Sequence, residues 1–357
     1  MSELNVQIKS KEKSYPIFIN NENLENLRTS ILTFIKNNNY IIIFSRKVYK
    51  IYGKILNFPK DKIFILKDGE NEKNKKNLDK ILNFALSKKL TRQDYIIAIG
   101  GGVVGDISGF AASIYMRGIN FIQVPTTLLA CTDSSVGGKT AINTDFGKNL
   151  IGTFYHPKAV FINVNFLKTL DERQFKSGLG EVVKYGFIEK SCHSNQEFNL
   201  INFLVENHDK ILSKNILTLM GLIEICINLK ISVVGQDEKE SGLRKILNFG
   251  HTYAHAIETL TKYKKYTHGE CVVNGILFAL KIAAKLEKID KEYKFLCEDL
   301  INKFEFTHIP NFDINKIIKI MQSDKKATAN EIIFILPCSY ARVEEEKFTP
   351  DTLKEII

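Results

Sequence analysis

Tyr95-Ile-Ile-Ala-Ile-Gly-Gly-Gly-Val-Val-Gly-Asp106 is the stretch of sequence that decides the fold. Its first five residues are apolar and rich in isoleucine, as in a strand that is covered on both faces of a parallel sheet. The glycines that follow permit a tight turn, and residues 107–116 have the composition of a helix. Strand, glycine turn and helix in this order are typical of a phosphate-binding loop, although the spacing differs from G-x-G-x-x-G and a purely structural turn stays open.

The surrounding sequence extends this pattern into a domain. Apolar runs at residues 40–44, 62–66 and 120–124 alternate with polar, helix-like segments, which is the rhythm of a parallel sheet flanked by helices. We therefore predict a Rossmann-like α/β domain over residues 1–164, of the kind that binds a nucleotide.

The remaining sequence has a different texture. Long helix-period stretches occupy residues 216–234 and 272–286, and a clear strand pattern returns only at residues 331–336. A chain of 357 residues is long enough for two packed cores. We predict a second, mostly α-helical domain over residues 165–357.

Composition narrows the possible partners and location. The 50 basic residues exceed the 40 acidic ones, but they are spread along the chain, so we expect an anionic small molecule rather than nucleic acid as the partner. The six cysteines include no C-x-x-C pair, which disfavours disulfides and a cysteine-rich zinc site. Since neither a signal peptide pattern nor an uncharged apolar run of about 18 residues is present, we predict a cytoplasmic protein without a membrane partner.

A histidine cluster carries the chemistry of the second half. Asn248, His251 and His255 would fall on one stripe of a helix, where a buried helix normally carries leucine or isoleucine. His268 follows a lysine-rich turn and could fold back onto the same face, so that two imidazoles would meet a divalent metal ion. A third ligand has to come from elsewhere in the chain.

Short polar blocks between the two regions indicate an anion site. Pro125-Thr-Thr127 is followed by Asp133-Ser-Ser-Val-Gly-Gly-Lys139-Thr140 and then by Gly147-Lys148-Asn149. The second block is not a P-loop, because its glycines and lysine do not fit G-x-x-x-x-G-K-[ST]. Lysine ammonium groups within glycine-rich segments nevertheless suit phosphate oxygens.

With these blocks in place, the chain resembles the 3-dehydroquinate synthases, a family of sugar-phosphate cyclases. The resemblance spans nearly the whole chain and rests on seven blocks in the family's order: residues 100–106, 124–127, 133–140, 180–186, 247–252, 268–270 and 324–326. It implies an N-terminal NAD-binding α/β domain, a C-terminal helical metal domain, and a site in the cleft between them. It also implies conversion of 3-deoxy-D-arabino-heptulosonate 7-phosphate to 3-dehydroquinate and phosphate, through transient oxidation by NAD, phosphate elimination, reduction and intramolecular aldol closure.

The resemblance supplies the missing metal ligand. It assigns Glu181, in Gly-Glu-Val-Val-Lys184, to the same ion as His251 and His268. A carboxylate and two imidazoles suit a catalytic zinc, and cobalt would also fit. Cys271, one helical turn after His268, is a possible competitor that we interpret as a core thiol.

The resemblance also assigns cofactor contacts. They fall on Asp68, Glu70, Lys73, Gly101, Gly102, Val103, Asp106, Thr126, Thr127, Lys139 and Lys148. The chain departs from the family at Ser45-Arg46, which replaces a Thr-Asp or Thr-Asn pair that often meets the adenosine ribose. Arg46 would suit the 2′-phosphate of NADP, whereas the other blocks favour NAD.

A further set of residues is carried over to the substrate. It consists of Arg117, Asp133, Lys139, Asn149, Lys184, Lys230, Arg244, Asn248, His255, Lys325 and Lys326. His255 and Asn248 suit phosphate and proton handling, with Asn149 and one of the lysines 325 and 326 completing the phosphate pocket.

The remaining assignments concern hydroxyls, the carboxylate and a second subunit. Asp133 and Lys184 suit substrate hydroxyls, while Lys230 and Arg244 suit the carboxylate and ring oxygens. Arg117 matches a family arginine that reaches the phosphate pocket of a neighbouring subunit, so a homodimer is expected.

Three alternatives remain. A 2-deoxy-scyllo-inosose synthase would share metal, NAD and fold, but it takes an uncarboxylated substrate and carries an acid at the position of Lys230. A polyol or glycerol-phosphate dehydrogenase would release NADH in proportion to product. A catalytically silent NAD-binding module is disfavoured, because every expected ligand and lysine is present.

Overall fold

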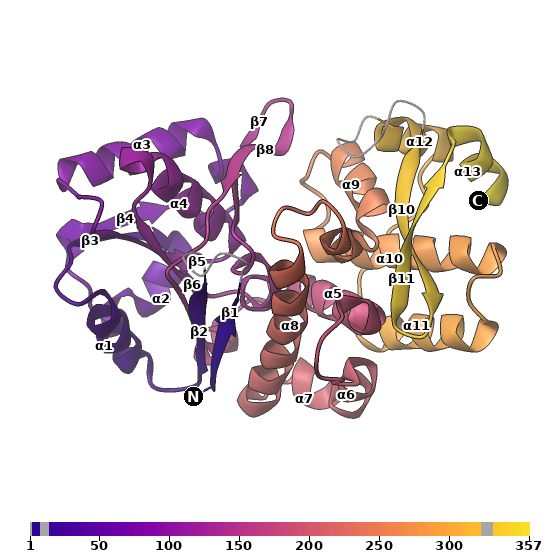
Figure 1. Ribbon diagram of the computed structural model, residues 1–357, viewed down its shortest axis with the longest axis horizontal. Coiled ribbons are helices and arrows are strands. Elements are labelled where there is room, and N and C mark those ends of the chain that lie inside the picture. Colours follow the sequence, from indigo (N-terminus) through magenta and orange to yellow (C-terminus); the bar gives the residue numbers. More distant parts are fainter. Residues whose placement is uncertain (1, 8–13, 323–330) are drawn as a thin grey trace. The chain divides into compact units, whose positions relative to one another are not determined.

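The computed structural model describes residues 2–7, 14–322 and 331–357 (Figure 1). Contacts divide the chain into two compact units: the first unit is Met1–Leu170 with Ile216–Ile231, and the second unit is Asp171–Asn215 with Ser232–Ile357. This division differs from the predicted ranges, because residues 165–170 and most of one long helix pack with the first unit. Each unit is described by itself below.

The first unit is built on a seven-stranded sheet. The strand order is β1-β2-β9-β6-β5-β3-β4, and every neighbouring pair is parallel except β1 with β2. The strands are β1 Ser2–Val6, β2 Tyr15–Asn20, β3 Tyr40–Ser45, β4 Ile63–Leu66, β5 Tyr95–Gly100, β6 Asn120–Pro125 and β9 Ala159–Asn163. The predicted parallel sheet is thereby confirmed, and the apolar runs 40–44, 62–66, 95–99 and 120–124 are its strands β3 to β6.

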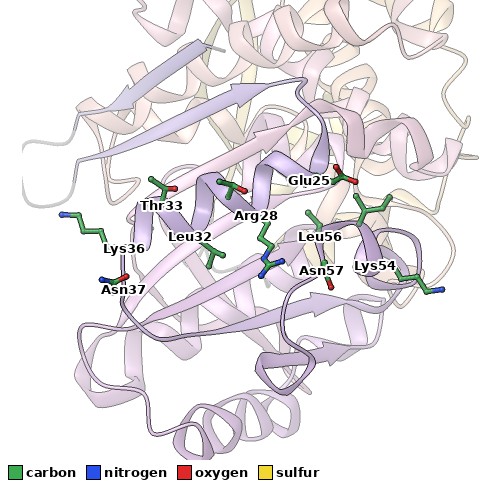
Figure 2. A pocket seen from close by; sticks show the side chains of 11 residues that line it. Glu25, Arg28, Leu32, Thr33, Lys36, Asn37, Lys54, Leu56 and Asn57 are labelled. Carbon is green, nitrogen blue, oxygen red and sulfur yellow. The ribbon is translucent and has the colours of Figure 1, made fainter.

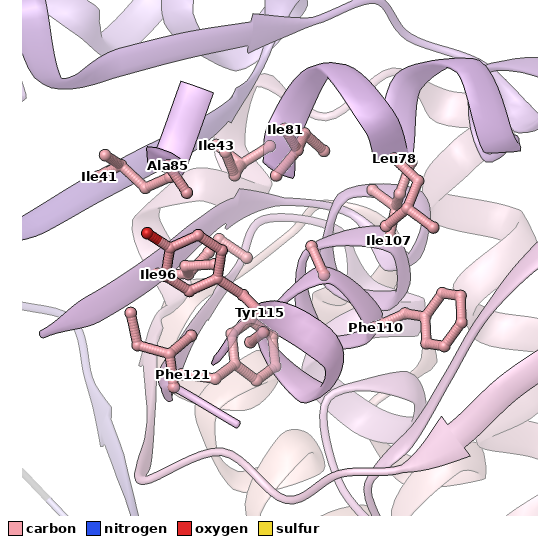
Figure 3. Close-up of a cluster of buried hydrophobic side chains, with 14 of the residues drawn as sticks. Ile41, Ile43, Leu78, Ile81, Ala85, Ile96, Ile107, Phe110, Tyr115 and Phe121 are labelled. Carbon is pink, nitrogen blue, oxygen red and sulfur yellow. The ribbon is translucent and has the colours of Figure 1, made fainter. Parts of the chain in front are cut away.

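Both faces of this sheet are buried, as continuous apolar strands require. On β3, Ile41 and Ile43 pack into one core cluster, while Ile42 and Phe44 pack into another. Figure 3 shows the first of these clusters, to which α3 and α4 contribute Leu78, Ile81, Ile107 and Phe110. The helices of the unit are α1 Leu24–Ile35, α2 Arg46–Leu56, α3 Lys75–Ser87 and α4 Gly102–Ile114.

A separate hairpin carries three of the predicted site residues. Strands β7 Lys139–Thr144 and β8 Gly147–Phe154 pair antiparallel, and Ile142 of β7 belongs to the core cluster of Figure 3. Most of β8 is exposed. Neither strand is predicted from the sequence, because the alternation of this segment is short and is interrupted by glycine and lysine.

The second unit is mostly helical, as predicted. It contains α5 Glu172–Ile188, α6 Leu200–Glu206, α7 His208–Leu212, α9 His251–Leu260, α10 His268–Lys285, α11 Lys291–Lys303, α12 Ile314–Gln322 and α13 Pro350–Ile356. Strands β10 Ile332–Ser339 and β11 Arg342–Phe348 form an antiparallel pair, of which only β10 was expected.

Helix α8, Ile216–Gln236, continues from the first unit into the second. Among the described residues it is the one helix long and apolar enough to cross a membrane by length and composition. The core helix of a soluble protein meets the same criteria. Lys230 of α8 is buried and forms an ion pair with Asp133 at 2.9 Å, which is a contact of the protein interior.

Close packing of α4 generates a stability prediction. A Cβ atom at Gly109 would lie 2.5 Å from Cγ2 of Thr140 and 2.9 Å from Cε1 of Phe121. We expect Gly109→Ala to lower the stability of the protein by about 1–3 kcal/mol through overpacking, measured as a lower thermal midpoint. Gly186→Ala is the matched control, because its nearest neighbour would lie 3.4 Å away. An equal effect of the two substitutions would contradict the packing argument.

Candidate active site

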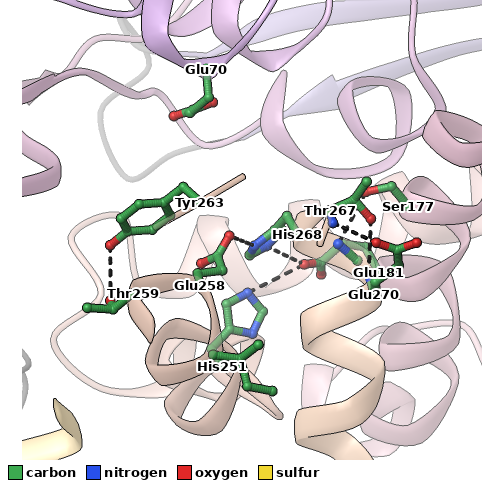
Figure 4. A network of polar contacts seen from close by, with 12 residues as sticks. Glu70, Ser177, Glu181, His251, Glu258, Thr259, Tyr263, Thr267, His268 and Glu270 are labelled. Atoms are coloured by element: carbon green, nitrogen blue, oxygen red, sulfur yellow. Dashed lines mark hydrogen bonds and ion pairs between the residues drawn. The ribbon is translucent and has the colours of Figure 1, made fainter. Parts of the chain in front are cut away.

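Three side chains that are distant in the sequence converge in the second unit. Glu181 lies in the middle of α5, while His251 and His268 are the first residues of α9 and α10. Their ligand atoms lie within 4.8 Å of one another. Oε1 of Glu181 is 3.4 Å from Nε2 of His251 and 3.0 Å from Nε2 of His268 (Figure 4).

Glycines bring the three helices close enough for this convergence. A Cβ atom at Gly180, the residue before Glu181, would lie 2.6 Å from the carbonyl oxygen of Gly269, the residue after His268. A Cβ atom at Gly250 would lie 2.7 Å from the carbonyl oxygen of Val272. Gly250 also has φ 79°, a conformation that favours glycine, directly before His251. The ligand positions therefore depend on close helix contacts that larger residues would prevent.

The two imidazoles are oriented through their Nδ1 atoms. Nδ1 of His251 lies 3.1 Å from the carbonyl oxygen of Phe249, and Nδ1 of His268 lies 3.3 Å from Oε1 of Glu258. A carbonyl and a carboxylate accept from an N–H group, so both contacts favour a proton on Nδ1. The Nε2 atoms of both rings are then directed at Glu181.

Buried charge dominates the electrostatics of this cluster. Glu181 is 1% exposed, and Nζ of Lys184, one turn later on α5, lies 2.5 Å from its Oε2. Burial opposes ionisation of Glu181, but Lys184 and His251 outweigh it and hold the pKa of Glu181 well below its usual range. Burial lowers the pKa of His251 to about 4, whereas Glu258 and Glu181 overcome burial and raise the pKa of His268 to about 10.

This donor set fits a divalent metal ion. Zinc–ligand bonds of about 2.0–2.1 Å in a tetrahedron separate the ligand atoms by roughly 3.3 Å, close to the 3.0 and 3.4 Å found between Glu181 and the imidazoles. One carboxylate and two imidazoles leave coordination positions for other oxygens. Cys271, the competing ligand considered above, is fully buried and is not part of this group.

The glycine motif of the first unit forms the start of α4. Gly101 is the N-cap of α4, and the helix begins at Gly102. The composition of the sequence predicted a later start, near residue 107, and that prediction is wrong. The glycines thus lie in the first helical turn, where backbone N–H groups have no partner within the helix. A Cβ atom at Gly101 would lie 2.9 Å from Cγ2 of Thr127, so a larger residue would close the approach to this turn.

Two threonines follow the adjacent strand β6. Oγ1 of Thr126 is buried and, among the described residues, has no hydrogen-bond partner, whereas Oγ1 of Thr127 accepts from the backbone N–H of Ala130 at 3.2 Å. An unsatisfied buried hydroxyl beside open N–H groups is typical of a site that receives a polar ligand. Dinucleotide phosphates fit this arrangement.

Charged residues surround the same end of the sheet. Nζ of Lys73 is buried, pairs with Asp106, and donates to Oδ1 of Asn149 at 2.5 Å. Burial opposes the charge of Lys73, but Asp106 and Glu70 raise its pKa, so the lysine stays protonated. The first unit therefore gathers Lys73, Asp106 and Asn149 into one polar cluster.

The hydroxyl of Ser45 donates to Oδ1 of Asp68 at 2.5 Å. Backbone N–H of Lys47 also donates to Asp68, at 3.1 Å to Oδ2. The serine that departs from the family pattern thus anchors one of the predicted cofactor residues.

Comparison with known proteins agrees with these two sites. The family model described as 3-dehydroquinate synthase N-terminal matches residues 63–177, and the model described as 3-dehydroquinate synthase C-terminal matches residues 178–327. The 3-dehydroquinate synthase of Alkaliphilus metalliredigens is 44% identical over 96% of this chain and 95% of its own length. That of Colwellia psychrerythraea is 41% identical over 97% of this chain and 98% of its own length.

The chain belongs to the 3-dehydroquinate synthase family. A solved 2-deoxy-scyllo-inosose synthase, complexed with carbaglucose-6-phosphate, NAD+ and Co2+, is similar over 99% of both chains with a TM-score of 0.85 and 26% identity. A probable glycerol dehydrogenase from Sinorhizobium meliloti shares the fold, with a TM-score of 0.67 and 14% identity over 95% of this chain and 94% of its own.

The other residues that 3-dehydroquinate synthases would assign to the substrate lie in different settings. Asp133 and Lys230 form the ion pair noted above, and Arg244 is 1% exposed. Lys139 and Arg117 are exposed, and Arg117 has a left-handed backbone with φ 65°. Lys325 and Lys326 lie outside the described residues.

The predicted stripe of Asn248, His251 and His255 is wrong in one respect. Asn248 is the last residue of a separate 3-10 helix, Leu243–Asn248. The left-handed backbone of Gly250 separates this helix from α9. Nδ2 of Asn248 instead donates to Oε1 of Glu240 at 2.6 Å. His251 and His255 do share one face of α9, with ring centroids 5.6 Å apart.

Sequence reasoning missed Glu258 and Asp237. Glu258 follows His255 by three residues on α9, a spacing that identifies a neighbour on the same helix face. Asp237 accepts backbone N–H bonds from Ser241, Gly242 and Arg244 at 2.7 to 3.0 Å. It therefore fixes the loop that leads to Arg244, and no sequence motif announces this.

A hollow between α1 and α2 is unrelated to either site. It has a volume of about 800 Å³ and contains no predicted site residue (Figure 2). Its lining residues include Glu25, Arg28, Leu32, Lys54 and Asn57. We assign this hollow no role, because none of the predicted metal, cofactor or substrate residues lines it.

Asp237 generates a pH prediction. Burial would raise the pKa of Asp237, but the three N–H donors lower it to about 2. A depressed pKa stabilises the folded state above the unfolded value near 4, and this contribution is lost as pH falls toward 2. We expect Asp237→Asn to lower the free energy of unfolding at pH 7 by at most about 2 kcal/mol, measured by urea denaturation.

The deficit of Asp237→Asn relative to the unsubstituted protein should shrink between pH 4 and pH 3. Glu206→Gln, at an exposed acid of the second unit, is the control and should change little at any pH. A deficit that stays constant on acidification would contradict the role of the Asp237 charge.

Proposed function

We propose that the protein is a 3-dehydroquinate synthase, which converts 3-deoxy-D-arabino-heptulosonate 7-phosphate to 3-dehydroquinate and phosphate. The observation that carries the proposal is the convergence of Glu181, His251 and His268 in a chain that matches 3-dehydroquinate synthases over nearly its full length. An enzyme of this kind acts on a soluble, phosphorylated small molecule, and we propose a cytoplasmic location for it.

Two cofactors are part of the proposal, NAD and one divalent ion, zinc or cobalt. When bound, the ion acidifies a substrate hydroxyl and NAD takes up and then returns a hydride. Glu181, His251 and His268 would hold the ion. The N–H groups of Gly101, Gly102 and Val103 would face the pyrophosphate.

Asp68 supports NAD over NADP. Its carboxylate is fixed by Ser45 at the end of β4, where it would accept from the ribose hydroxyls. The same negative charge would repel a 2′-phosphate. Arg46 is exposed at the start of α2, where solvent and salt would screen its charge.

The residues of the second unit would handle protons and hydroxyls. Lys184 holds its ammonium group against Glu181, so it is placed to donate to a substrate oxygen that approaches the ion. His255 lies on the same helix face as His251 and would exchange a proton with substrate or phosphate. Arg244 and Asn248 would complete the set of polar donors.

The residues of the first unit would hold the nucleotide and substrate oxygens. Lys230 and Asp133 offer a paired cation and anion for the carboxylate and hydroxyls. Lys139, Lys148 and Asn149, on the β7–β8 hairpin, offer donors for phosphate. Thr126, Thr127, Glu70, Lys73 and Asp106 are proposed as the other NAD contacts, and Lys325 or Lys326 as a further phosphate contact.

Two competing activities are less well supported. The 2-deoxy-scyllo-inosose synthase has a similar fold but is only 26% identical, compared with 44% for a 3-dehydroquinate synthase. Lys230 is suited to a carboxylate, which an uncarboxylated sugar substrate does not have. The glycerol dehydrogenase likeness, at 14% identity, concerns the fold alone.

A single assay tests this proposal. We expect the purified protein, given NAD, Zn2+ or Co2+ and 3-deoxy-D-arabino-heptulosonate 7-phosphate, to release phosphate and form 3-dehydroquinate without accumulating NADH. Removal of the metal with a chelator should abolish phosphate release, and added Zn2+ or Co2+ should restore it. NADH absorbance that rises in proportion to product would indicate a dehydrogenase instead.

A homodimer with shared sites is the second part of the proposal. Arg117→Ala and His251→Ala should each be inactive or nearly so as pure proteins. Mixed after reversible subunit dissociation, they should regain part of the activity, because one of the two sites in a heterodimer would receive an intact Arg117 and an intact His251. Mixing two batches of His251→Ala alone is the control. If the mixture stays inactive although heterodimers form, Arg117 does not act across a subunit interface.

A further inference from the structure

Glu258 is a buried acid that none of the predicted roles uses. It lies on α9 and is 4% exposed, and its Oε1 lies 3.3 Å from Nδ1 of His268 (Figure 4). His268 begins a different helix, α10, so the contact links the ends of two helices.

The position of Glu258 within α9 is unfavourable for a negative charge, so the charge does not stabilise the helix itself. Helix α9 ends at Leu260, so Glu258 lies in the last turn, where the helix dipole disfavours a negative charge. Burial adds a desolvation cost that only nearby donors or cations offset. His268, which lies outside the helix, is one partner that offsets this cost.

Two other buried acids of the second unit differ in their tasks. Oε1 and Oε2 of Glu189 accept backbone N–H bonds from Phe198, Asn199 and Leu200, so this side chain closes a loop. Glu270 completes the N-terminal cap of α10 and pairs with Arg173. Glu258, in contrast, has its carboxylate against the ring of a proposed metal ligand.

We propose that Glu258 is a positioning residue for the metal centre, which holds His268 with its proton on Nδ1 and its Nε2 directed toward the ion. This inference rests on the proposed function of Glu181, His251 and His268. His251 receives the same kind of support from a neutral carbonyl, that of Phe249. The carboxylate of Glu258 adds a negative charge. It therefore makes Nε2 of His268 a stronger ligand for the metal ion, and it also fixes the orientation of the ring.

The test compares metal affinity in three variants. Metal-free protein is titrated with Co2+ or Zn2+ against a chelator of known affinity, and the absorption spectrum of the cobalt-loaded protein is recorded. We expect Glu258→Ala to weaken metal binding by roughly 10–100-fold and to change the cobalt spectrum. Glu258→Gln should fall between Glu258→Ala and the unsubstituted protein, because an amide oxygen accepts from Nδ1 but carries no charge. Glu258→Asp should restore the charge at a longer distance and regain part of the affinity.

The control is Glu189→Gln, the same chemical change at a similarly buried acid that lies away from the cluster. It should lower the thermal midpoint while leaving metal affinity and the cobalt spectrum unchanged. If Glu258→Ala does not fold, Glu258→Gln, which is nearly isosteric, decides the question by the same two readouts.

Two outcomes separate this inference from the proposed function. The first outcome is that the unsubstituted protein binds the metal and Glu258→Ala binds it equally tightly with the same spectrum. The inference about Glu258 is then overturned and the proposed function stands. Where the alanine variant does not fold, the same result for Glu258→Gln leads to the same conclusion. If the unsubstituted protein binds neither Co2+ nor Zn2+, the proposed function fails first. Excess metal should recover activity in Glu258→Gln if its defect is one of metal affinity.

Discussion

The buried carboxylate of Glu181 is the constraint on which the second unit depends. A carboxylate that is 1% exposed is unfavourable unless cations or strong donors surround it. Lys184 supplies one full charge, and the imidazoles of His251 and His268 approach from two other helices. Removal of one partner from a buried pair costs about 3–5 kcal/mol, because the other charge is left uncompensated. The helices α5, α9 and α10 are thus held together by the same contacts that form the proposed metal centre.

The first unit also contains a buried charge that its neighbours compensate, but here the charge is positive. Lys73 is 3% exposed, and its ammonium group is compensated by Asp106 and by the amide oxygen of Asn149. Asn149 comes from the β7–β8 hairpin and has a left-handed backbone with φ 55°. One buried charge therefore ties α4 and the hairpin to the segment before α3. In both units, the residues that compensate a buried charge are also those proposed to meet a ligand. A bound ligand that carries charge can replace part of this compensation.

Sequence patterns predicted the elements whose periodicity or composition is strong and missed those that depend on tertiary contacts. The isoleucine-rich runs predicted β3 to β6, because strands covered on both faces must be apolar throughout. The start of α4 was predicted too late, since glycine has a low helix propensity and only the structure shows that the glycines lie in the first turn. Asn248 was placed on the wrong element, because the left-handed φ of Gly250 is not visible in a helical periodicity. Glu258 was missed because its partner, His268, lies on another helix.

The departure from the family pattern at Ser45-Arg46 can be understood from the contacts of Ser45. Its hydroxyl lies 3.5 Å from the backbone nitrogen of Val48, as the N-cap of α2, and donates to Asp68 at 2.5 Å. An acid in place of Arg46 would bring a second negative charge close to Asp68, whereas a basic residue there does not. In the proposed NAD site, a single carboxylate, Asp68, would meet the ribose hydroxyls and disfavour a 2′-phosphate. Under the proposed NAD binding, loss of the usual pair would not require a change of cofactor, because Asp68, just after the neighbouring strand β4, still carries a negative charge.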